Sequence, residues 1–384
     1  MTRMTTKAMT KNNYCSQKFW FLSVNAERQE INSCCAAEYS KIDVKWLRDH
    51  PGELFNTELL KTERQHMLGN QRVPSCRSCW AAEDRGLPSR RSLMSTDVKT
   101  HTDIHSEPTE ISLFLGLSCN LTCSYCSKEY STAWLQDIKN AGTYFDNDPR
   151  FDLTAYDQVI LKLGQKALQR HDSVQLLVDE IAKYQSVKKV VIAGGEPFLQ
   201  NGLIDVVNKL PGQVEIFSGL GVAHTRFKNI LEALPRERVR IVLSAENIDN
   251  LYEFNRYGSK YHAFMENLNT IKQLGFTHGF NSVISNLTVF GFRDFLHAFK
   301  EDDIFVQSCT DPAYLGASVI DPESRQRLLD TDYGSLTDTI HQLVGSAVDD
   351  ALRIKGAHFI KEFARRRSLS LAVFPESFIR WLNV

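Results

Sequence analysis

Short apolar runs alternate with amphipathic segments along the chain from residue 111 onward. The apolar runs have the length of strands, and the segments between them place apolar residues at helical spacing. Strands are predicted at residues 111–117, 189–193, 214–217, 239–243, 278–284 and 304–307. Helices are predicted at residues 155–170, 173–184, 203–209, 226–233, 263–274 and 292–299. Strands that alternate with helices in this way are typical of a parallel α/β sheet.

The two ends of the chain follow other patterns. Before the repeats, the pattern predicts a strand at residues 19–24, helical pieces at 44–48, 54–60, 64–68 and 81–85, and a polar linker at 97–107. After the repeats, residues 323–363 are predicted to be helical. We therefore predict an N-terminal module with its linker at residues 1–105, an α/β domain at 106–322 and a helical C-terminal extension at 323–384.

Three cysteines, Cys119, Cys123 and Cys126, lie in the loop that leaves the first strand of the repeats. A loop can wrap three sulfurs around one inorganic cube, which a regular helix or strand cannot do. Three thiolates on a four-iron cluster leave one iron without a protein ligand, and that iron can bind a small chelating molecule. The alternative is a zinc site, but zinc usually takes four ligands, and no histidine close after Cys126 completes such a set.

The Cys-x3-Cys-x2-Cys spacing, with Tyr125 directly before the last cysteine, resembles the hallmark of the radical S-adenosylmethionine (SAM) superfamily. This resemblance implies that Cys119, Cys123 and Cys126 hold a [4Fe–4S] cluster, and that SAM chelates the fourth iron through its amino and carboxylate groups. It also implies that the predicted strands and helices form a partial (βα)6 TIM-like barrel. Active residues are then expected at the C-terminal ends of the strands.

Composition and charge narrow the class of protein. A net charge of −1 gives no general attraction to nucleic acid or to an anionic membrane, and no apolar run is long enough to span a bilayer. The chain has nine cysteines, an odd number that does not suit a disulfide framework, and eight of them precede residue 127. The polar N-terminus does not have the pattern of a secretory signal. We therefore expect a cytoplasmic protein with metal chemistry in its first third.

Five cysteines form a second group nearer the N-terminus: Cys15, Cys34, Cys35, Cys76 and Cys79. One Cys-x2-Cys pair and two distant thiols suffice for a site of four thiolates, which could hold zinc or an iron–sulfur cluster. Neighbouring side chains of an extended segment point apart, so only one of Cys34 and Cys35 is expected to be a ligand. Alternatively, all five are buried free cysteines.

The segments around Cys34 and around Cys76-Arg-Ser-Cys79-Trp resemble the auxiliary-cluster module of SPASM/twitch radical SAM proteins. That resemblance implies a second, auxiliary [4Fe–4S] cluster. The family usually places the module after the barrel, whereas here it comes first, as in a subset of twitch-type proteins. The number of protein ligands, and therefore whether this cluster keeps an open iron, stays undecided.

Three further motifs follow predicted strands of the repeats. Gly194-Gly195-Glu196-Pro197 combines glycines that let backbone approach a ligand with an acceptor for an ammonium group and a stiff turn. The resemblance implies that this motif holds the amino group of SAM. Considered alone, the motif could be a plain turn. The remaining positions that the superfamily pattern assigns to SAM are Ser244, Glu246, Arg256, Val283 and Ile284.

Within that pattern, Ser244 and Glu246 would bond the ribose or the methionyl end of SAM, with Glu246 where aspartate is commoner. Arg256 could pair bidentately with the SAM carboxylate, and Val283 and Ile284 would flank adenine. The other interpretation is a capping serine with a surface Arg–Glu pair and an ordinary core strand at Val283 and Ile284.

The resemblance implies a radical SAM enzyme that cleaves SAM reductively and removes a hydrogen atom from a substrate. A peptide or protein side chain is the favoured substrate, and a flavodoxin or ferredoxin would donate the electron. The first alternative is dehydrogenation or rearrangement of a small metabolite, such as a sugar, a nucleoside or an amino-acid-like molecule. The second is a non-catalytic iron–sulfur binding or sensor protein.

Overall fold

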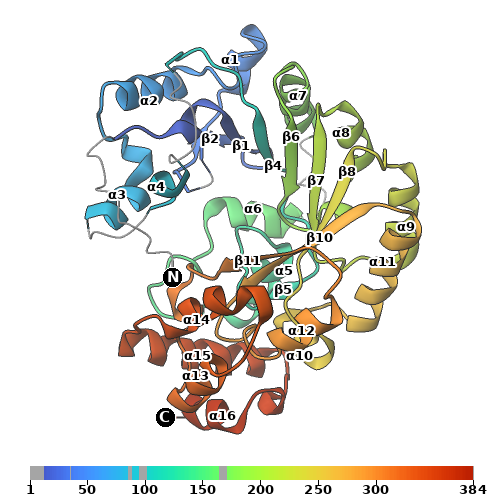
Figure 1. Ribbon diagram of the computed structural model, residues 1–384. Helices are drawn as coiled ribbons and strands as arrows, with labels where there is room; N and C mark the ends of the chain where they lie inside the picture. Colours follow the sequence, from blue (N-terminus) through green and yellow to red (C-terminus); the bar gives the residue numbers. More distant parts are fainter. Residues whose placement is uncertain (1–12, 35, 85–88, 95–101, 164–170, 384) are drawn as a thin grey trace. The chain divides into compact units, whose positions relative to one another are not determined.

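The computed structural model describes residues 13–34, 36–84, 89–94, 102–163 and 171–383 (Figure 1). These residues belong to two compact units. The first unit comprises Met1–Phe114, Arg170–Ile192 and Lys209–Val214, and the second comprises Leu115–Gln169, Ala193–Asn208 and Glu215–Val384. The predicted division into three consecutive parts differs from these two discontinuous units, and it stays a prediction.

The first unit contains strands that run both parallel and antiparallel. β1 (Phe21–Asn25) pairs in parallel with β4 (Glu110–Phe114) and antiparallel with β2 (Glu30–Asn32), which pairs in turn with β3 (Ser40–Lys41). β6 (Lys189–Ala193) lies next to β4 in the strand order. The helices of this unit are α1 (Val44–Asp49), α2 (Glu58–Leu68), α3 (Arg77–Asp84), α4 (Arg90–Met94) and α7 (His171–Ile181).

The second unit is built around parallel strands. β10 (Thr277–Ile284) lies between β8 (Val239–Leu243) and β11 (Ile304–Ser308) and runs parallel to both, and β7 (Gln213–Ser218) follows β8 in the order. The helices that connect these strands are α8 (Leu203–Lys209), α9 (His224–Ala233), α10 (Asp249–Asn255), α11 (Tyr261–Gln273) and α12 (Phe292–Ala298). The prediction of an α/β fold with mostly parallel strands is confirmed.

Helices before and after the strands complete the second unit. α5 (Thr132–Ala141) and α6 (Ala155–Leu163) follow the cysteine loop. α13 (Pro322–Leu329), α14 (Thr337–Gly345), α15 (Asp350–Arg366) and α16 (Glu376–Leu382) pack together near the C-terminus (Figure 1). No helix among the described residues is long and apolar enough to cross a membrane.

Some predicted boundaries are wrong for identifiable reasons. The strand predicted at residues 111–117 ends at Phe114, although Leu115 and Leu117 are buried like the strand residues before them. The helix predicted at residues 54–60 begins only at Glu58, because Thr57 caps it by accepting a hydrogen bond from the Leu60 N–H. The helix predicted at residues 155–170 is described as far as Leu163. The last residue of the helical piece predicted at residues 81–85, and Cys35, lie outside the described residues.

Aromatic residues of α5 and α15 form the core beneath the cysteine loop. Trp134 lies 6.4 Å from Phe359 and 6.0 Å from Phe363 between ring centroids, and its indole Nε1 donates to the carbonyl oxygen of Cys123 at 3.1 Å. Arg367 stacks over Trp134 and donates to Thr122 Oγ1 at 2.9 Å. Arg367, which directly follows α15, therefore helps to fix the backbone that carries the second cysteine.

Candidate functional site

The loop from Cys119 to Cys126 is held in one conformation by the start of α5. Thr132 Oγ1 accepts from the Cys119 N–H at 3.2 Å and donates to the Cys119 carbonyl at 3.0 Å. Ser131 Oγ donates to the Leu121 carbonyl at 2.7 Å, and the Cys126 N–H donates to the Cys123 carbonyl at 3.0 Å. A short strand, β5 (Thr122–Cys123), pairs with β9 (Arg256–Tyr257), so that Cys123 lies opposite Arg256.

The three thiols of this loop influence one another electrostatically. Burial, with a contribution from the charge of Cys123, raises the pKa of Cys119 to about 12. Burial likewise raises the pKa of Cys126, with contributions from Cys123 and Cys119. Burial raises the pKa of Cys123, whereas Arg256 opposes that shift. The three thiols therefore lie close enough to affect one another, and a metal cluster that they bind has to displace their protons.

No group of three or more His, Cys, Asp or Glu side chains among the described residues is placed to share a single metal ion. A four-iron cluster makes a different demand, because it places each cysteine on a different iron. The three thiols therefore need to surround a volume rather than converge on one point. The loop, which carries all three within eight residues and leaves Cys119 and Cys126 partly exposed, fits that demand.

The glycine pair after β6 touches the cysteine loop. Gly194 and Gly195 have φ angles of +88° and +55°, which favour glycine. A Cβ on Gly195 would lie 2.6 Å from the Gly116 carbonyl oxygen and 2.7 Å from that of Ser118. The Glu196 N–H donates to the Ser118 carbonyl at 2.8 Å. A side chain at Gly195 would therefore separate the Gly-Gly-Glu-Pro turn from the loop.

The carboxylate of Glu196 is buried and accepts hydrogen bonds from neighbouring protein groups. Its Oε1 accepts from Ser218 Oγ at 2.9 Å and from the Phe198 N–H at 3.2 Å, and its Oε2 accepts from the Gly219 N–H at 3.1 Å. Burial nevertheless raises the pKa of Glu196 to about 7, because these bonds and the charge of Arg256 offset desolvation only in part. A cation bound beside Glu196 would favour its ionised form. Pro197 starts the turn that follows it.

Arg256 and Glu246 form a buried ion pair in the same place. Arg256 Nη2 lies 2.8 Å from Glu246 Oε1, and Arg256 Nη1 lies 3.7 Å from Cys123 Sγ. The Tyr125 hydroxyl donates to Glu246 Oε1 at 2.7 Å and also contacts Arg256. The Val283 N–H donates to the same Glu246 oxygen at 3.2 Å. The alternative of a surface Arg–Glu pair is thus wrong, since both side chains are almost fully buried.

The other three predicted positions differ in what surrounds them. Ser244 follows β8, and its N–H donates to the Ser218 carbonyl at 2.8 Å. Val283 and Ile284 are consecutive in β10, so their side chains lie on opposite faces of the strand. Only Val283, which bonds Glu246 through its backbone, lies on the face of the candidate site, whereas Ile284 is fully buried.

Two residues that the sequence reasoning missed support the site. Ser218, the last residue of β7, bonds Glu196, and Asn255 accepts a hydrogen bond from Ser124 Oγ at 3.0 Å. The position of Ser218 could have been found, since it directly follows a predicted strand and such ends gather active residues. The position of Asn255 could not, because its partner lies 131 residues away.

The second group of cysteines gathers in the first unit. Cys15 and Cys76 pack with Phe19, Met67, Val73 and Trp80. Burial raises the pKa of Cys15 to about 11, and the charges of Cys34 and Cys76 add to this shift. Burial also raises the pKa of Cys76, and the charge of Cys79 contributes to that rise. A buried ion pair, Lys18 to Glu63 at 2.6 Å, lies beside these thiols.

Comparison with known proteins matches part of the chain to one family. The profile of the Radical SAM superfamily matches residues 114–299. GTP 3',8-cyclase 3 of Mycobacterium bovis and its counterpart in Mycobacterium tuberculosis are each 24% identical over 184 residues, which are 46% of this chain and 40% of the relative. The chain thus matches less than half the length of these curated relatives.

Among solved structures, anSMEcpe with bound AdoMet and Cp18Cys peptide is similar at a TM-score of 0.36 and 13% identity, over 57% of each chain. Streptococcus suis SuiB bound to S-adenosylmethionine is similar at a TM-score of 0.34 and 14% identity, over 86% of this chain and 69% of that one. Resemblance at this level carries no argument about substrate. The profile match covers the cysteine loop, the Gly-Gly-Glu-Pro turn and the Glu246–Arg256 pair, so residues 114–299 match the radical SAM superfamily.

Proposed function

We propose that this protein is a radical SAM enzyme whose site lies in the second unit. One observation carries the proposal: the cysteine loop, Glu196 and the Glu246–Arg256 pair meet in one buried place, joined by the bonds described above. Members of the superfamily use a [4Fe–4S] cluster and SAM, and Cys119, Cys123 and Cys126 would hold that cluster. When bound, the cluster supplies an electron that cleaves SAM to methionine and a 5′-deoxyadenosyl radical, which takes a hydrogen atom from the substrate.

The residues of the chain would bind and orient SAM. Glu196 accepts its ammonium group, and the glycines before it let the backbone come close to the ligand. Arg256, which lies beside Cys123, attracts the carboxylate. Glu246, which already accepts bonds from Tyr125 and Val283, holds Arg256 in place and offers an acceptor to the ribose, together with Ser244. Because the groups around Glu196, Glu246 and Arg256 are buried, water is kept away from them.

The titration of Glu196 makes SAM binding dependent on pH. Its carboxyl group has a pKa raised to about 7 by burial, so acidification below that value protonates it and removes the charge that holds the ammonium group. We expect the affinity for SAM to fall by about tenfold per pH unit below about pH 7. The Glu196→Gln variant should bind weakly with a flatter profile. Anaerobic equilibrium dialysis between about pH 5.5 and 8 measures both.

The Glu253→Gln variant is the matched control, because Glu253 pairs with Lys260 on the surface and the pKa of its carboxyl is lowered. It should reproduce the wild-type profile. A wild-type affinity that does not change between pH 5.5 and 8 would contradict the role assigned to Glu196.

We also propose that the first unit holds an auxiliary [4Fe–4S] cluster on Cys15, Cys34, Cys76 and Cys79, and that it accepts or relays an electron. The mutual influence of these buried thiols supports the proposal. The membership of the SPASM/twitch subset rests on the same module. The Cys76→Ala/Cys79→Ala variant should lose about four irons per chain on anaerobic reconstitution and keep the site of the second unit. Iron analysis with Mössbauer spectroscopy decides this, and an unchanged iron content would refute the auxiliary cluster.

A peptide or protein side chain is the substrate that we propose. A cavity of about 250 Å³ lies beside the cysteine loop and is lined by Tyr125, Cys126, Arg150 and Tyr314, among others. Arg150 stacks over the Tyr314 ring, with its carbon 4.9 Å from the centroid, and is fixed by Asp148 at 2.6 Å. An opening of this size admits one side chain next to the third cysteine, with aromatic walls and one cation to orient it.

The second candidate is radical chemistry on a small metabolite, and the similarity to proteins named GTP 3',8-cyclase favours a nucleotide among such molecules. An electron donor such as flavodoxin or ferredoxin would serve either reaction. A substrate labelled with deuterium at the reacting carbon separates the two candidates, because the label appears in 5′-deoxyadenosine only from the molecule that the radical attacks. A cluster-replete protein that never cleaves SAM would instead be a binding or sensor protein.

A further inference from the structure

The strand β11 ends the order of strands that the structure describes, so one of its edges has no neighbouring strand. Its pairing with β10 shows which groups face that edge. The Phe280 N–H donates to the Asp303 carbonyl, and the Cys309 N–H donates to the Ile284 carbonyl. In a parallel ladder the bonding residues alternate. The odd-numbered residues of β11 therefore bond β10, and the N–H and C=O groups of Ile304, Val306 and Ser308 point to the open edge.

This edge lacks the usual protection against pairing with another chain. Natural sheet edges carry lysine, proline or a bulge that prevents such pairing, but β11 reads Ile-Phe-Val-Gln-Ser. Phe305 is 63% exposed. The described residues form no backbone hydrogen bond to Ile304, Val306 or Ser308 outside the ladder. A strand with these properties is suited to receive an extended backbone from a partner.

The edge reaches the proposed active site. Gln307 lies opposite Val283 in the register, and the Val283 N–H donates to Glu246. A strand added beside β11 would lie about two strand spacings, or roughly 10 Å, from β10. Phe305 and Gln307 share the face of β10 that carries Val283, so alternate side chains of an added strand would point to the side of the cysteine loop and Glu246.

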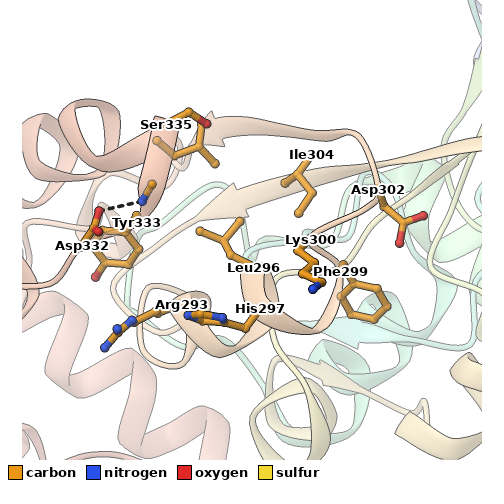
Figure 2. Close-up of a pocket in the computed structure, with 12 residues that line it drawn as sticks. Arg293, Leu296, His297, Phe299, Lys300, Asp302, Ile304, Asp332, Tyr333 and Ser335 are labelled. Carbon is orange, nitrogen blue, oxygen red and sulfur yellow. Dashed lines mark hydrogen bonds between the residues drawn. The ribbon is translucent and has the colours of Figure 1, made fainter.

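The other alternate side chains would point to a cavity of about 570 Å³ (Figure 2). Ile304 lies on this side, because its partner Phe280 packs on Phe295 and Phe299 of α12. In Figure 2, Arg293, His297 and Lys300 follow one another along one wall, and Asp332 and Tyr333 lie near the end of the cavity at which Arg293 lies.

The charges of this cavity favour a carboxylate. Asp302 is already engaged by Lys272 at 3.2 Å and His278 at 2.8 Å. Asp332 accepts from the Gly334 N–H at 2.8 Å and from Thr337 Oγ1 at 2.9 Å. By contrast, Arg293 forms no ion pair within 4.0 Å with the described residues, although its charge acts on Asp332 and Tyr333, and the contact of Lys300 is with exposed Glu301 at 3.9 Å. Arg293 and Lys300 are therefore better able than Asp302 and Asp332 to pair with a new charged group.

We propose that the edge of β11 docks the peptide substrate as an added strand, with an acidic side chain of that peptide in the cavity beside Ile304. The inference rests on the proposed function, since it takes the substrate to be a peptide. Docking in this way would fix the register of the peptide, because strand pairing presents every second side chain to the same face.

The test uses the full chain, reconstituted anaerobically, and a library of random dodecapeptides displayed on their messenger RNA. Selected peptides should be enriched in acidic residues. On binding, they should slow amide hydrogen exchange in the segment that contains Ile304, Val306 and Ser308. Val306→Pro removes one outward N–H without removing a bond of the β10–β11 ladder, and we expect it to weaken binding by about tenfold. The matched control Val306→Ala should stay within about twofold.

The Arg293→Ala/Lys300→Ala variant tests the cavity separately. It should weaken the binding of the acidic peptides by about fivefold and abolish the enrichment in acidic residues. The proposal is overturned if no peptide is selected, if the peptides protect another segment, or if they bind Val306→Pro as tightly as the wild type. It is also overturned if the edge is already protected by a second copy of the chain, seen as protection that grows with protein concentration.

Circular dichroism and iron content check that Val306→Pro folds. If this variant does not fold, the amide hydrogen exchange of the wild type with bound peptide decides whether β11 is the docking site. Failure of docking and failure of the proposed function are distinguishable. A chain that cleaves SAM but selects no peptide refutes only the docking site, whereas a chain that cannot cleave SAM refutes the proposed function.

Discussion

Replacing Cys123 by alanine is expected to remove about four irons per chain and to lower the rate of SAM cleavage by at least about a thousandfold. The reason is that a [4Fe–4S] cluster held by three thiolates loses a ligand that no neighbouring residue can replace. Cys123 also lies beside Arg256, at 3.7 Å from Nη1, so its loss disturbs the proposed carboxylate contact. Iron analysis, the visible spectrum of the cluster and the yield of 5′-deoxyadenosine measure the effect.

The Cys309→Ala variant is the matched control. Cys309 is 5% exposed, directly follows β11 and belongs to neither group of cysteines. Burial raises the pKa of its thiol to about 12, as it does for Cys119. Loss of this thiol should leave iron content and SAM cleavage unchanged. Equal losses in Cys309→Ala and Cys123→Ala would show that burial of the thiols, rather than ligation of a cluster, explains the phenotype.

The second large effect concerns the ion pair of Glu246 and Arg256. We expect Arg256→Met to lower the free energy of unfolding of the cluster-free protein by about 3–5 kcal/mol, because it leaves the buried Glu246 without its cation. The double variant Glu246→Met/Arg256→Met should recover most of this loss, since no unpaired charge remains. Neither variant should bind SAM. Urea unfolding and equilibrium dialysis measure stability and binding independently.

An exposed arginine provides the control for this experiment. Arg380 is 64% exposed and lies 3.4 Å from Glu323 and 3.5 Å from Glu376. The Arg380→Met variant should change the free energy of unfolding by less than about 1 kcal/mol. A double variant as unstable as Arg256→Met would mean that shape rather than charge explains the loss. A double variant that still binds SAM would contradict the role assigned to the pair.

Local patterns predicted several parallel strands well, because each is a short apolar run between polar segments. The strand predicted at residues 239–243 has the bounds of β8, and the one at 189–193 those of β6. The pattern failed after Phe114, where a loop is buried under other residues and is therefore apolar like a strand. It also missed β5 and β9, because a strand of two residues has no period to detect.

The features of the site likewise divide into those that the sequence predicted and those that it did not. The cysteines, Glu196 and Arg256 were found in the sequence because each belongs to a contiguous motif. The bond from Trp134 to the Cys123 carbonyl, and that from Tyr125 to Glu246, depend on which elements pack together. Sequence spacing does not contain that information. The same reason explains why Val283 and Ile284 were predicted as a pair, although alternation in β10 separates their side chains.

The central claim is that the site of the second unit cleaves SAM. The most direct test incubates the anaerobically reconstituted, chemically reduced protein with SAM and measures 5′-deoxyadenosine and methionine by mass spectrometry, with Cys123→Ala in parallel. We expect both products in equal amounts from the wild type and neither from the variant. A wild-type sample that contains its full complement of iron and yields no 5′-deoxyadenosine would contradict the account.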